Sequence, residues 1–371
     1  MRGVIRKRRE FLKLMRACTV DRGYFTVTDI QRQAGIPRST AQDWINRLLD
    51  EGCVVVRERK MGRNPAKYAA ISALPSSACR RIFTTVDGER VEIYHECMST
   101  ACAAFCAYHH SRARGVLEDV TRDGPLLRER AHMGQSSVEI GLYPASAVGV
   151  AGVERIGNEI VQRIRCIGGP AYSLTDMMAK AEGVCDVSLQ KSGGVVEGSV
   201  RTRALTHLVI GLDDTDSHEG GATFALALAL LQHLETMRGV LPISHHVAML
   251  NPAIPKKTAG NSCSYIEVAI PSERYESVRD RALLFIQDES LSPDWGIAFR
   301  RGFSLPKDLR VFGKRARSEV IEPEEADRAA AENGVEIFGG QGRIGALAAI
   351  ALSGLPHEVL LRPFSDMPPG T

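Results

Sequence analysis

Apolar positions at helical spacing dominate the first part of the chain. They form one stripe over residues 6–18 and another over 39–49, and Thr28 starts a short helix, TDIQRQAG, between them. Three valines at 54–56 and a returning segment enclose a polar tip, which is typical of a two-stranded ribbon. The order of helix, helix, turn, helix and ribbon predicts a winged helix-turn-helix over residues 1–72.

Continuous apolar runs replace these stripes in the last part of the chain. Residues 208–212 predict a buried strand, and residues 222–234 predict an apolar helix. An alternating strand at 263–270 follows, and at 336–352 a glycine loop opens an Ala- and Leu-rich helix. Strands that alternate with helices predict a mixed α/β, kinase-like domain over residues 205–360.

Residues 80–200 show weaker patterns and predict an α+β middle region. Residues 81–94 surround an Asp-Gly turn, which predicts a hairpin. Strand-like segments are expected at 138–142 and 147–150, and amphipathic helices at 152–164 and 173–182. The chain is therefore expected to be an α/β (α+β) multidomain protein. A flexible connection into the last domain is expected at Gly193, Gly194 and Gly198.

The charge is distributed unevenly along the chain. The formal net charge is +3, but residues 1–68 hold 16 Lys and Arg against 7 Asp and Glu, a net of +9. The remaining residues therefore sum to −6. A basic N-terminal module joined to a mildly acidic body points to a polyanion as the partner of the module.

The basic module resembles the winged-helix domains of archaeal and bacterial regulators. In such modules the second helix of the pair enters the major groove while flanking cations meet phosphates. DNA is favoured over RNA, and protein docking is the third alternative. A homodimer is one expected assembly, because such regulators often pair. The candidate contacts with nucleic acid are Arg38, Ser39, Thr40 and Gln42 on the second helix and Arg59 and Arg63 on the wing.

The segment HECMSTACAAFCAYHH, residues 95–110, gathers thiols and imidazoles. Cys102 and Cys106 share a face of the expected helix, and Cys97 precedes them. Thiolate and imidazole ligands suit Zn²⁺ or an iron–sulfur cluster. The alternative is a helix with small buried thiols, because free cysteine packs like a small hydrophobic residue.

The apolar run at 208–212 leads directly into the polar turn DDTDSHEGGAT. Carboxylates this close repel one another unless a cation neutralises them, and oxygen ligands on a short loop suit Mg²⁺ together with phosphates. Glycines then let the backbone approach a ligand, and the helix that follows directs N–H groups at an anion. The alternative is a turn whose aspartates are solvated caps. The candidate residues are Asp213, Asp214, Asp216, Gly220 and Gly221.

Two further polar loops interrupt the apolar segments of the same domain. LNPAIPKKTAGN offers two ammonium groups and a hydroxyl, which suit phosphate. GGQGRIG opens a helix in an anion-binding arrangement, although a tight turn explains its glycines equally well. The candidate nucleotide ligands are Asn251, Lys256, Lys257, Thr258, Gly340, Gly342 and Arg343.

Taken together, the blocks GLDDTDSHEGGAT, LNPAIPKKTAGN and GGQGRIGALAAI resemble the catalytic, kinase-like domain of archaeal tRNA agmatidine (2-agmatinylcytidine) synthetase. They also resemble the related methanogenesis marker protein 11 family. The resemblance implies that the aspartates hold Mg²⁺ with ATP and that the lysines and glycine loops cradle the phosphates. Thr223 falls where the synthetase carries the threonine that becomes phosphorylated, although here Phe224 follows it in place of a second threonine.

Two functions are consistent with these features. The first is an enzyme that transfers a phosphoryl or nucleotidyl group from Mg²⁺-ATP to an unidentified acceptor and binds nucleic acid through its winged helix. The second is a DNA-binding transcriptional regulator whose last domain senses a nucleotide or metabolite. The sequence shows neither a secretory signal nor a run of 18 apolar residues, so a cytoplasmic protein with reduced or metal-bound cysteines is expected.

Overall fold

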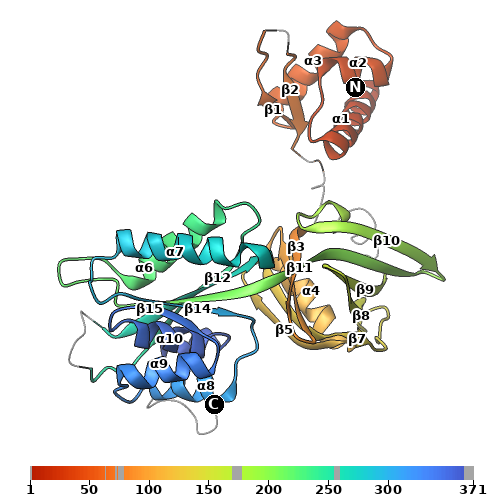
Figure 1. Cartoon of the computed structure of the whole chain (residues 1–371). Coiled ribbons are helices and arrows are strands. Elements are labelled where there is room, and N and C mark those ends of the chain that lie inside the picture. The colour runs from red at the N-terminus through yellow and green to blue at the C-terminus, as the bar shows by residue number, and fades with distance from the viewer. Residues whose placement is uncertain are drawn as a thin grey trace.

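The computed structural model describes residues 2–62, 64–71, 73, 79–168, 178–254 and 260–362. Its N-terminal part is a three-helix module with a two-stranded ribbon (Figure 1). Met15, Ile30 and Ile45 are fully buried in one core, where the apolar stripes of the three helices meet. The predicted winged helix-turn-helix is therefore confirmed. Its elements are α1 (Arg2–Arg22), α2 (Val27–Ala34), α3 (Arg38–Asp50), β1 (Val54–Glu58) and β2 (Lys67–Ala70).

Helix α2 begins earlier than its sequence suggests, so the cap expected at Thr28 is wrong. The capping residue is Thr26, whose hydroxyl accepts a hydrogen bond from the N–H of Asp29 at 3.3 Å. The carboxylate of Asp29 in turn accepts from the N–H of Thr26 at 2.8 Å. This reciprocal pair satisfies two of the N–H groups that a helix start leaves open. Gly35 ends α2 in the left-handed region, with φ 61°.

The middle region is a set of antiparallel strands that pack around helix α4. The predicted hairpin at 81–94 is present, because β3 and β4 pair along their length. The elements of the region are β3 (Cys79–Asp87), β4 (Arg90–Cys97), α4 (Thr100–Arg112), β5 (Leu117–Asp123), β6 (Leu126–His132), β7 (Gly134–Gln135), β8 (Val148–Ile156), β9 (Glu159–Ile167), η2 (Met178–Lys180) and β10 (Val184–Ser192).

Several secondary-structure expectations for this region are wrong. Residues 152–164, expected as a helix, belong to the antiparallel pair β8 and β9, which turns at Gly157 with φ 61°. Residues 138–142, expected as a strand, make only the isolated bridge between Val138 and Arg114. Of the helix expected at 173–182, residues 173–177 lie outside the described residues, and the other half contains only the 3₁₀ turn Met178–Lys180.

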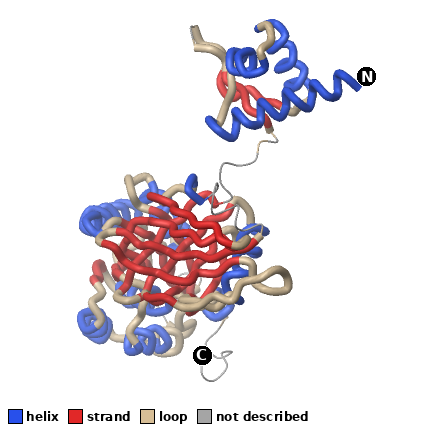
Figure 2. Tube along the Cα trace, turned by 90° about the vertical axis from the view of Figure 1, so that its right-hand side faces the viewer, coloured by secondary structure: helices blue, strands red, loops and turns tan. Residues whose placement is uncertain are grey.

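Strand β11 (Val195–Asp213) organises the body. Its first half pairs with β9 and β10, and its second half pairs with β13 and β14. Gly193 and Gly194 close the β10–β11 hairpin and Gly198 lies within the strand, so the expected flexible connection is wrong. The boundary expected at 200–205 lies inside β11, and the two regions share one sheet (Figure 2).

The last region has three layers with the sheet in the middle (Figure 1). Helices α6 and α7 cover the face that buries Leu208 and Ile210, while α8, α9 and α10 cover the face that buries Val209. This arrangement confirms the predicted fold class. Within the described ranges, no helix has the length and apolar character needed to cross a membrane. The elements are α6 (Thr223–Glu235), β12 (Leu241–Met249), β13 (Ser262–Ile270), η3 (Ser272–Arg274), α7 (Tyr275–Glu289), β14 (Gly296–Arg301), α8 (Lys307–Arg315), α9 (Pro323–Glu332), β15 (Glu336–Gly339), α10 (Arg343–Leu352) and α11 (His357–Leu361).

Candidate functional site

The strand register brings three separate loops to one end of the sheet. Asp213, the last residue of β11, lies opposite Gly296 of β14, and Gly296 lies opposite Gly339 at the end of β15. On the other side of β11, β13 pairs with β12, so that Met249 lies opposite Ser262. The loops that follow β11, β12 and β15 therefore lie at the same end of the sheet.

Asp213 is held against the first turn of α10. A Cβ atom at Gly345 would lie 1.7 Å from Oδ2 of Asp213, so glycine is required for the carboxyl to occupy this position. Burial raises the pKa of Asp213 well above its ordinary range, and the charges of Asp214 and Asp216 raise it further, although a hydrogen bond from the N–H of Asp214 opposes them. A cation bound here would relieve this repulsion.

The next two aspartates lie on the turn that leads into α6. Asp214 has φ 54°, a left-handed conformation that is uncommon for residues other than glycine and is concentrated at functional sites. Asp216 accepts a hydrogen bond from the hydroxyl of Thr223 at 3.0 Å. The Thr223 oxygen in turn accepts hydrogen bonds from the N–H and the hydroxyl of Thr215 at 3.2 and 3.1 Å. Thr223 is thus fixed with its proton directed at a carboxylate.

Gly220 and Gly221 shape the loop between the aspartates and α6. Gly221 has φ 88°, and a Cβ atom there would lie 3.2 Å from Cβ of Asp216. The backbones of Gly220 and Ser217 exchange two hydrogen bonds of 2.9 and 3.1 Å. Ala222 precedes α6 and provides no side-chain cap, so the first N–H groups of α6 suit an anion.

The glycine loop after β15 packs on Asp294 and Trp295, which directly precede β14. The N–H of Gly340 donates to the carbonyl of Trp295 at 2.8 Å, and that of Gly342 donates to the carbonyl of Asp294 at 2.7 Å. Both N–H groups therefore already donate hydrogen bonds within the protein, so other groups must provide the contacts with phosphate. Asp294 adds a partly buried carboxyl to the end of the sheet where these loops meet. Its place follows from the pairing of β14 with β11, which no local pattern around Asp294 reveals.

Arg343, a candidate phosphate ligand, fixes the glycine loop to α9. Its guanidinium donates to both carboxylate oxygens of Asp327 at 2.8 and 3.1 Å and to the carbonyl of Gly340 at 3.0 Å. The hydrogen bonds with Asp327 raise the pKa of Arg343, because they favour its charged form. This arrangement assigns Arg343 to positioning the loop.

Asn251 stands at the start of the loop that follows β12. Its buried side-chain oxygen accepts a hydrogen bond from the N–H of Ala253 at 3.0 Å, and its backbone carbonyl accepts one from the side-chain amide of Asn261 at 2.8 Å. Asn251 therefore joins the two ends of the loop. The remaining candidates of this loop, Lys256, Lys257 and Thr258, lie outside the described residues.

In the part of the chain that the structure describes, no three His, Cys, Asp or Glu side chains converge as a metal-ligand group. The aspartate turn nevertheless fits Mg²⁺, which keeps several waters and binds through one or two carboxylates together with phosphates. The raised pKa of Asp213 supports this fit, because a cation favours the ionised carboxyl.

The candidate nucleic-acid contacts gather at the start of α3. Arg38 and Ser39 are exposed, and the guanidinium of Arg38 donates to the hydroxyl of Thr28 at 3.3 Å. Pro37 precedes α3 and provides no side-chain cap, which leaves the first N–H groups suited to a phosphate. Thr40 and Gln42 are partly exposed, Arg59 is exposed beyond β1, and Arg63 lies outside the described residues.

Comparison with known families identifies both ends of the chain. The family described as the TiaS TCKD domain matches residues 209–305, which contain the aspartate turn and strands β13 and β14. The family described as the sugar-specific transcriptional regulator TrmB matches residues 18–73. The chain carries a TiaS-like domain behind a TrmB-like winged helix.

Individual relatives cover the chain to different extents. The chain is 34% identical over 164 residues to the tRNA 2-agmatinylcytidine synthetase TiaS of Pyrococcus horikoshii, a match that covers 41% of this chain and 38% of that protein. It is 25% identical over 278 residues to an uncharacterized protein of Methanocaldococcus jannaschii, covering 74% and 91%. A crystal structure of TiaS in complex with its tRNA and ATP is 26% identical with a TM-score of 0.35, covering 39% and 36%. The chain thus spans little more than a third of the TiaS synthetases it matches.

The cysteines of the middle region do not form the expected three-ligand set. Cys97 is buried at the end of β4, whereas Cys106 is partly exposed and Cys102 fully exposed on α4. Cys97, Cys102 and Cys106 are all described residues, and they are not part of any group of three metal-ligating side chains. The thiols of Cys79 and Cys106 affect the pKa of Cys97.

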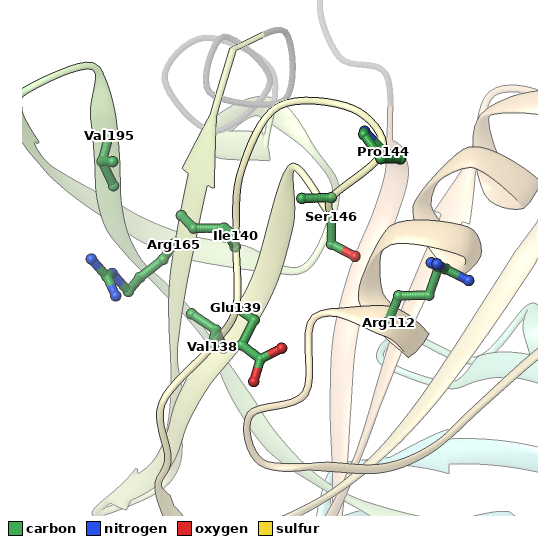
Figure 3. Close-up of a pocket in the computed structure, with 9 residues that line it drawn as sticks. Arg112, Val138, Glu139, Ile140, Pro144, Ser146, Arg165 and Val195 are labelled. Carbon is green, nitrogen blue, oxygen red and sulfur yellow. The ribbon is translucent and has the colours of Figure 1, made fainter.

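A cavity of about 710 Å³ opens in the middle region (Figure 3). Arg112, Glu139 and Arg165 are the charged residues that line it, and no candidate site residue lies among its lining. Arg165 pairs with Glu197 at 2.8 Å, and Glu139 lies 3.5 Å from Arg114. Each of the two glutamates is thus paired with an arginine, which leaves the lining with one more positive than negative charge.

Proposed function

We propose that the TiaS-like domain binds Mg²⁺-ATP and transfers a phosphoryl or nucleotidyl group to an acceptor. The observation that carries the proposal is the packing of the Asp213 carboxyl on Gly345, at an edge where loops far apart in the sequence meet. The TiaS relatives support ATP as the nucleotide, because one of them was solved in complex with tRNA and ATP.

Asp213 and Asp214 are the proposed ligands of Mg²⁺, with Asp216 beside them. When bound, Mg²⁺ neutralises the charge that develops on the transferred group. The uncapped start of α6 is the proposed contact for phosphate, together with the loop whose ends Asn251 joins. From the sequence, Lys256, Lys257 and Thr258 remain the proposed side-chain ligands of the phosphates.

Thr223 is the proposed first acceptor. Its hydroxyl donates to Asp216 at 3.0 Å, an arrangement in which the carboxylate takes the proton as the oxygen becomes a nucleophile. Thr223 is only 6% exposed, so its phosphorylation requires a donor bound within the same site. The resemblance to the synthetase, in which the corresponding threonine is phosphorylated, supports this role.

Nucleic-acid recognition is proposed for the winged helix, with DNA favoured over RNA. The exposed Arg38 and the uncapped start of α3 favour a phosphate backbone as its partner. This feature also supports the second candidate function, a DNA-binding regulator whose TiaS-like domain senses a nucleotide. A homodimer stays a prediction, which rests on the frequent dimerisation of winged-helix regulators.

The test compares labelled ATP in two forms. Full-length protein with Mg²⁺ would be given γ-labelled ATP to follow phosphoryl transfer and α-labelled ATP to follow nucleotidyl transfer, with and without bulk tRNA. Asp214→Asn is the test variant, and Asp119→Asn, an exposed aspartate on β5, is the matched control.

We expect turnover or labelling in the wild type and in the Asp119 variant, and its loss in the Asp214 variant. Label mapped to Thr223 would identify the first acceptor. The enzymatic function would be refuted if ATP binding and turnover were absent, or if they were equal in all three proteins. The DNA-binding regulator would then remain as the candidate function. That function in turn requires salt-sensitive binding to DNA upstream of its own coding sequence.

A further inference from the structure

Three cysteines meet where β3 begins and β4 ends. Cys79, the first residue of β3, lies directly opposite Cys97, the last residue of β4. Cys106 lies on α4, which packs against β4. The thiols of Cys79 and Cys106 both lie close enough to that of Cys97 to affect its pKa. Neither the proposed nucleotide site nor the winged helix makes use of this cluster.

Strand geometry distinguishes one pair within the cluster. Directly opposed residues of antiparallel strands have Cα atoms about 4.5–5.5 Å apart, within the range of about 4.4–6.8 Å that disulfides span. The pairing of β3 and β4 places Cys79 opposite Cys97, next to a register shift between Cys79 and Arg81. Cys106 approaches Cys97 from a helix, so no strand register fixes that pair.

Cys79 is the more accessible member of the pair. It lines a cavity of about 670 Å³ together with Arg80 and Met98 of the body and Arg57 of the winged helix. Its exposed fraction is 7%, against 4% for Cys97. A small oxidant therefore reaches Cys79 first.

We propose that Cys79 and Cys97 are a redox-active dithiol that a hydroperoxide converts into a cross-strand disulfide. The Cys79 thiolate attacks one oxygen of hydrogen peroxide, the O–O bond breaks, and the released hydroxide leaves as water with the thiol proton. The Cys97 sulfur then attacks the sulfenic acid, the S–S bond forms, the S–O bond breaks, and a second water carries away the Cys97 proton. Two thiols lose two electrons, and the peroxide is reduced to two waters.

Access supports this order of attack. Cys79 lines the cavity beside Arg80 and Met98, whereas Cys97 is only 4% exposed and is not among the residues that line it. This makes Cys97 the second residue to react. The disulfide would tie the first residue of the body to β4 beside the winged helix.

The test treats the full chain with a modest excess of hydrogen peroxide. Free thiols would be counted by alkylation and mass spectrometry, and linked peptides would be mapped without reduction. Variants Cys79→Ser and Cys106→Ser separate the two pairings. Cys166→Ser is the matched control, because Cys166 is buried on β9 with its thiol directed to the carbonyl of Val196 at 3.6 Å.

We expect the wild type to lose two of its nine cysteine thiols and to yield a peptide that joins Cys79 to Cys97, reversibly with dithiothreitol. The Cys106 and Cys166 variants should behave in the same way, and the Cys79 variant should not form the link. A wild-type peptide that joins Cys97 to Cys106, or no loss of thiols, would overturn the proposal. Since this map uses the wild-type protein, the decision does not depend on the folding of a variant.

Discussion

Replacing Gly345 by alanine should separate nucleotide binding from stability. The new Cβ would lie 1.7 Å from Oδ2 and 2.4 Å from Cγ of Asp213, distances that no side chain tolerates. The carboxyl must rotate away, and because Cβ of Asp213 would also lie only 2.9 Å from the new atom, the first turn of α10 must shift slightly as well. Asp213 would then leave the position in which we propose that it meets Mg²⁺.

The stability cost of this substitution should be small. Alanine is favoured over glycine within a helix by about 1 kcal/mol, and overpacking costs about 1–3 kcal/mol. The free energy of unfolding should therefore fall by about 2 kcal/mol at most. Losing the Asp213 contact should raise the Kd for Mg²⁺-ATP at least about tenfold, which corresponds to about 1.4 kcal/mol.

Gly313→Ala is the matched control, because Gly313 of α8 packs on Ala351 of α10 and a Cβ there would lie 2.8 Å from Cβ of Ala351. Calorimetric titration with Mg²⁺-ATP and urea unfolding would be carried out on both variants. We expect Gly313→Ala to lose stability and to keep its affinity, whereas Gly345→Ala loses affinity. Wild-type affinity in Gly345→Ala, or equal losses in both variants, would refute the reasoning.

Three further predictions concern charge. Burial raises the pKa of Asp213 on folding, so the free energy of unfolding of the wild type falls as the pH rises from about 3.9 through the folded pKa. Asp213→Asn should therefore be more stable than the wild type at pH 7 and equally stable at pH 3.5. Urea unfolding without Mg²⁺ measures both. Glu267→Gln should cost about 1.5–3 kcal/mol in the same assay, because the partly buried Arg128 loses the carboxylate 2.9 Å away and keeps only Glu92, at 3.8 Å. Arg38→Ala should weaken DNA binding in fluorescence titrations and reduce the salt slope by about one.

Each of these predictions has a contradicting result. Equal stability of Asp213→Asn and the wild type at pH 7 would show that the carboxyl is not destabilised by its surroundings. A loss below about 1 kcal/mol for Glu267→Gln would show that the ion pair between β13 and β6 is solvated. An unchanged salt slope for Arg38→Ala would remove that residue from the nucleic-acid interface.

Local signals carried the predictions that the structure confirms. The winged helix follows from apolar spacing within residues 1–72, and the strand into Asp213 follows from one apolar run beside three carboxyls. In both cases the determining residues are neighbours in the chain. The physical cause can therefore be recognised without the tertiary fold.

The expectations that failed depended on weak or long-range signals. Residues 152–164 place apolar residues at spacings that suit a helix, but the two-residue turn Gly157–Asn158 reverses the chain and pairs Ile156 with Glu159. Asp294 reaches the site only because β14 pairs with β11, which lies far away in the sequence. The engagement of Arg343 by Asp327 likewise depends on how α9 packs.

Hydrogen exchange with and without a non-hydrolysable Mg²⁺-ATP analogue tests the central claim most directly. If the loops form one nucleotide site, the analogue should slow exchange in residues 213–224 and 340–346 together, and Asp214→Asn should abolish both effects. Slowed exchange that is absent from both segments, or confined to the winged helix, would contradict the account.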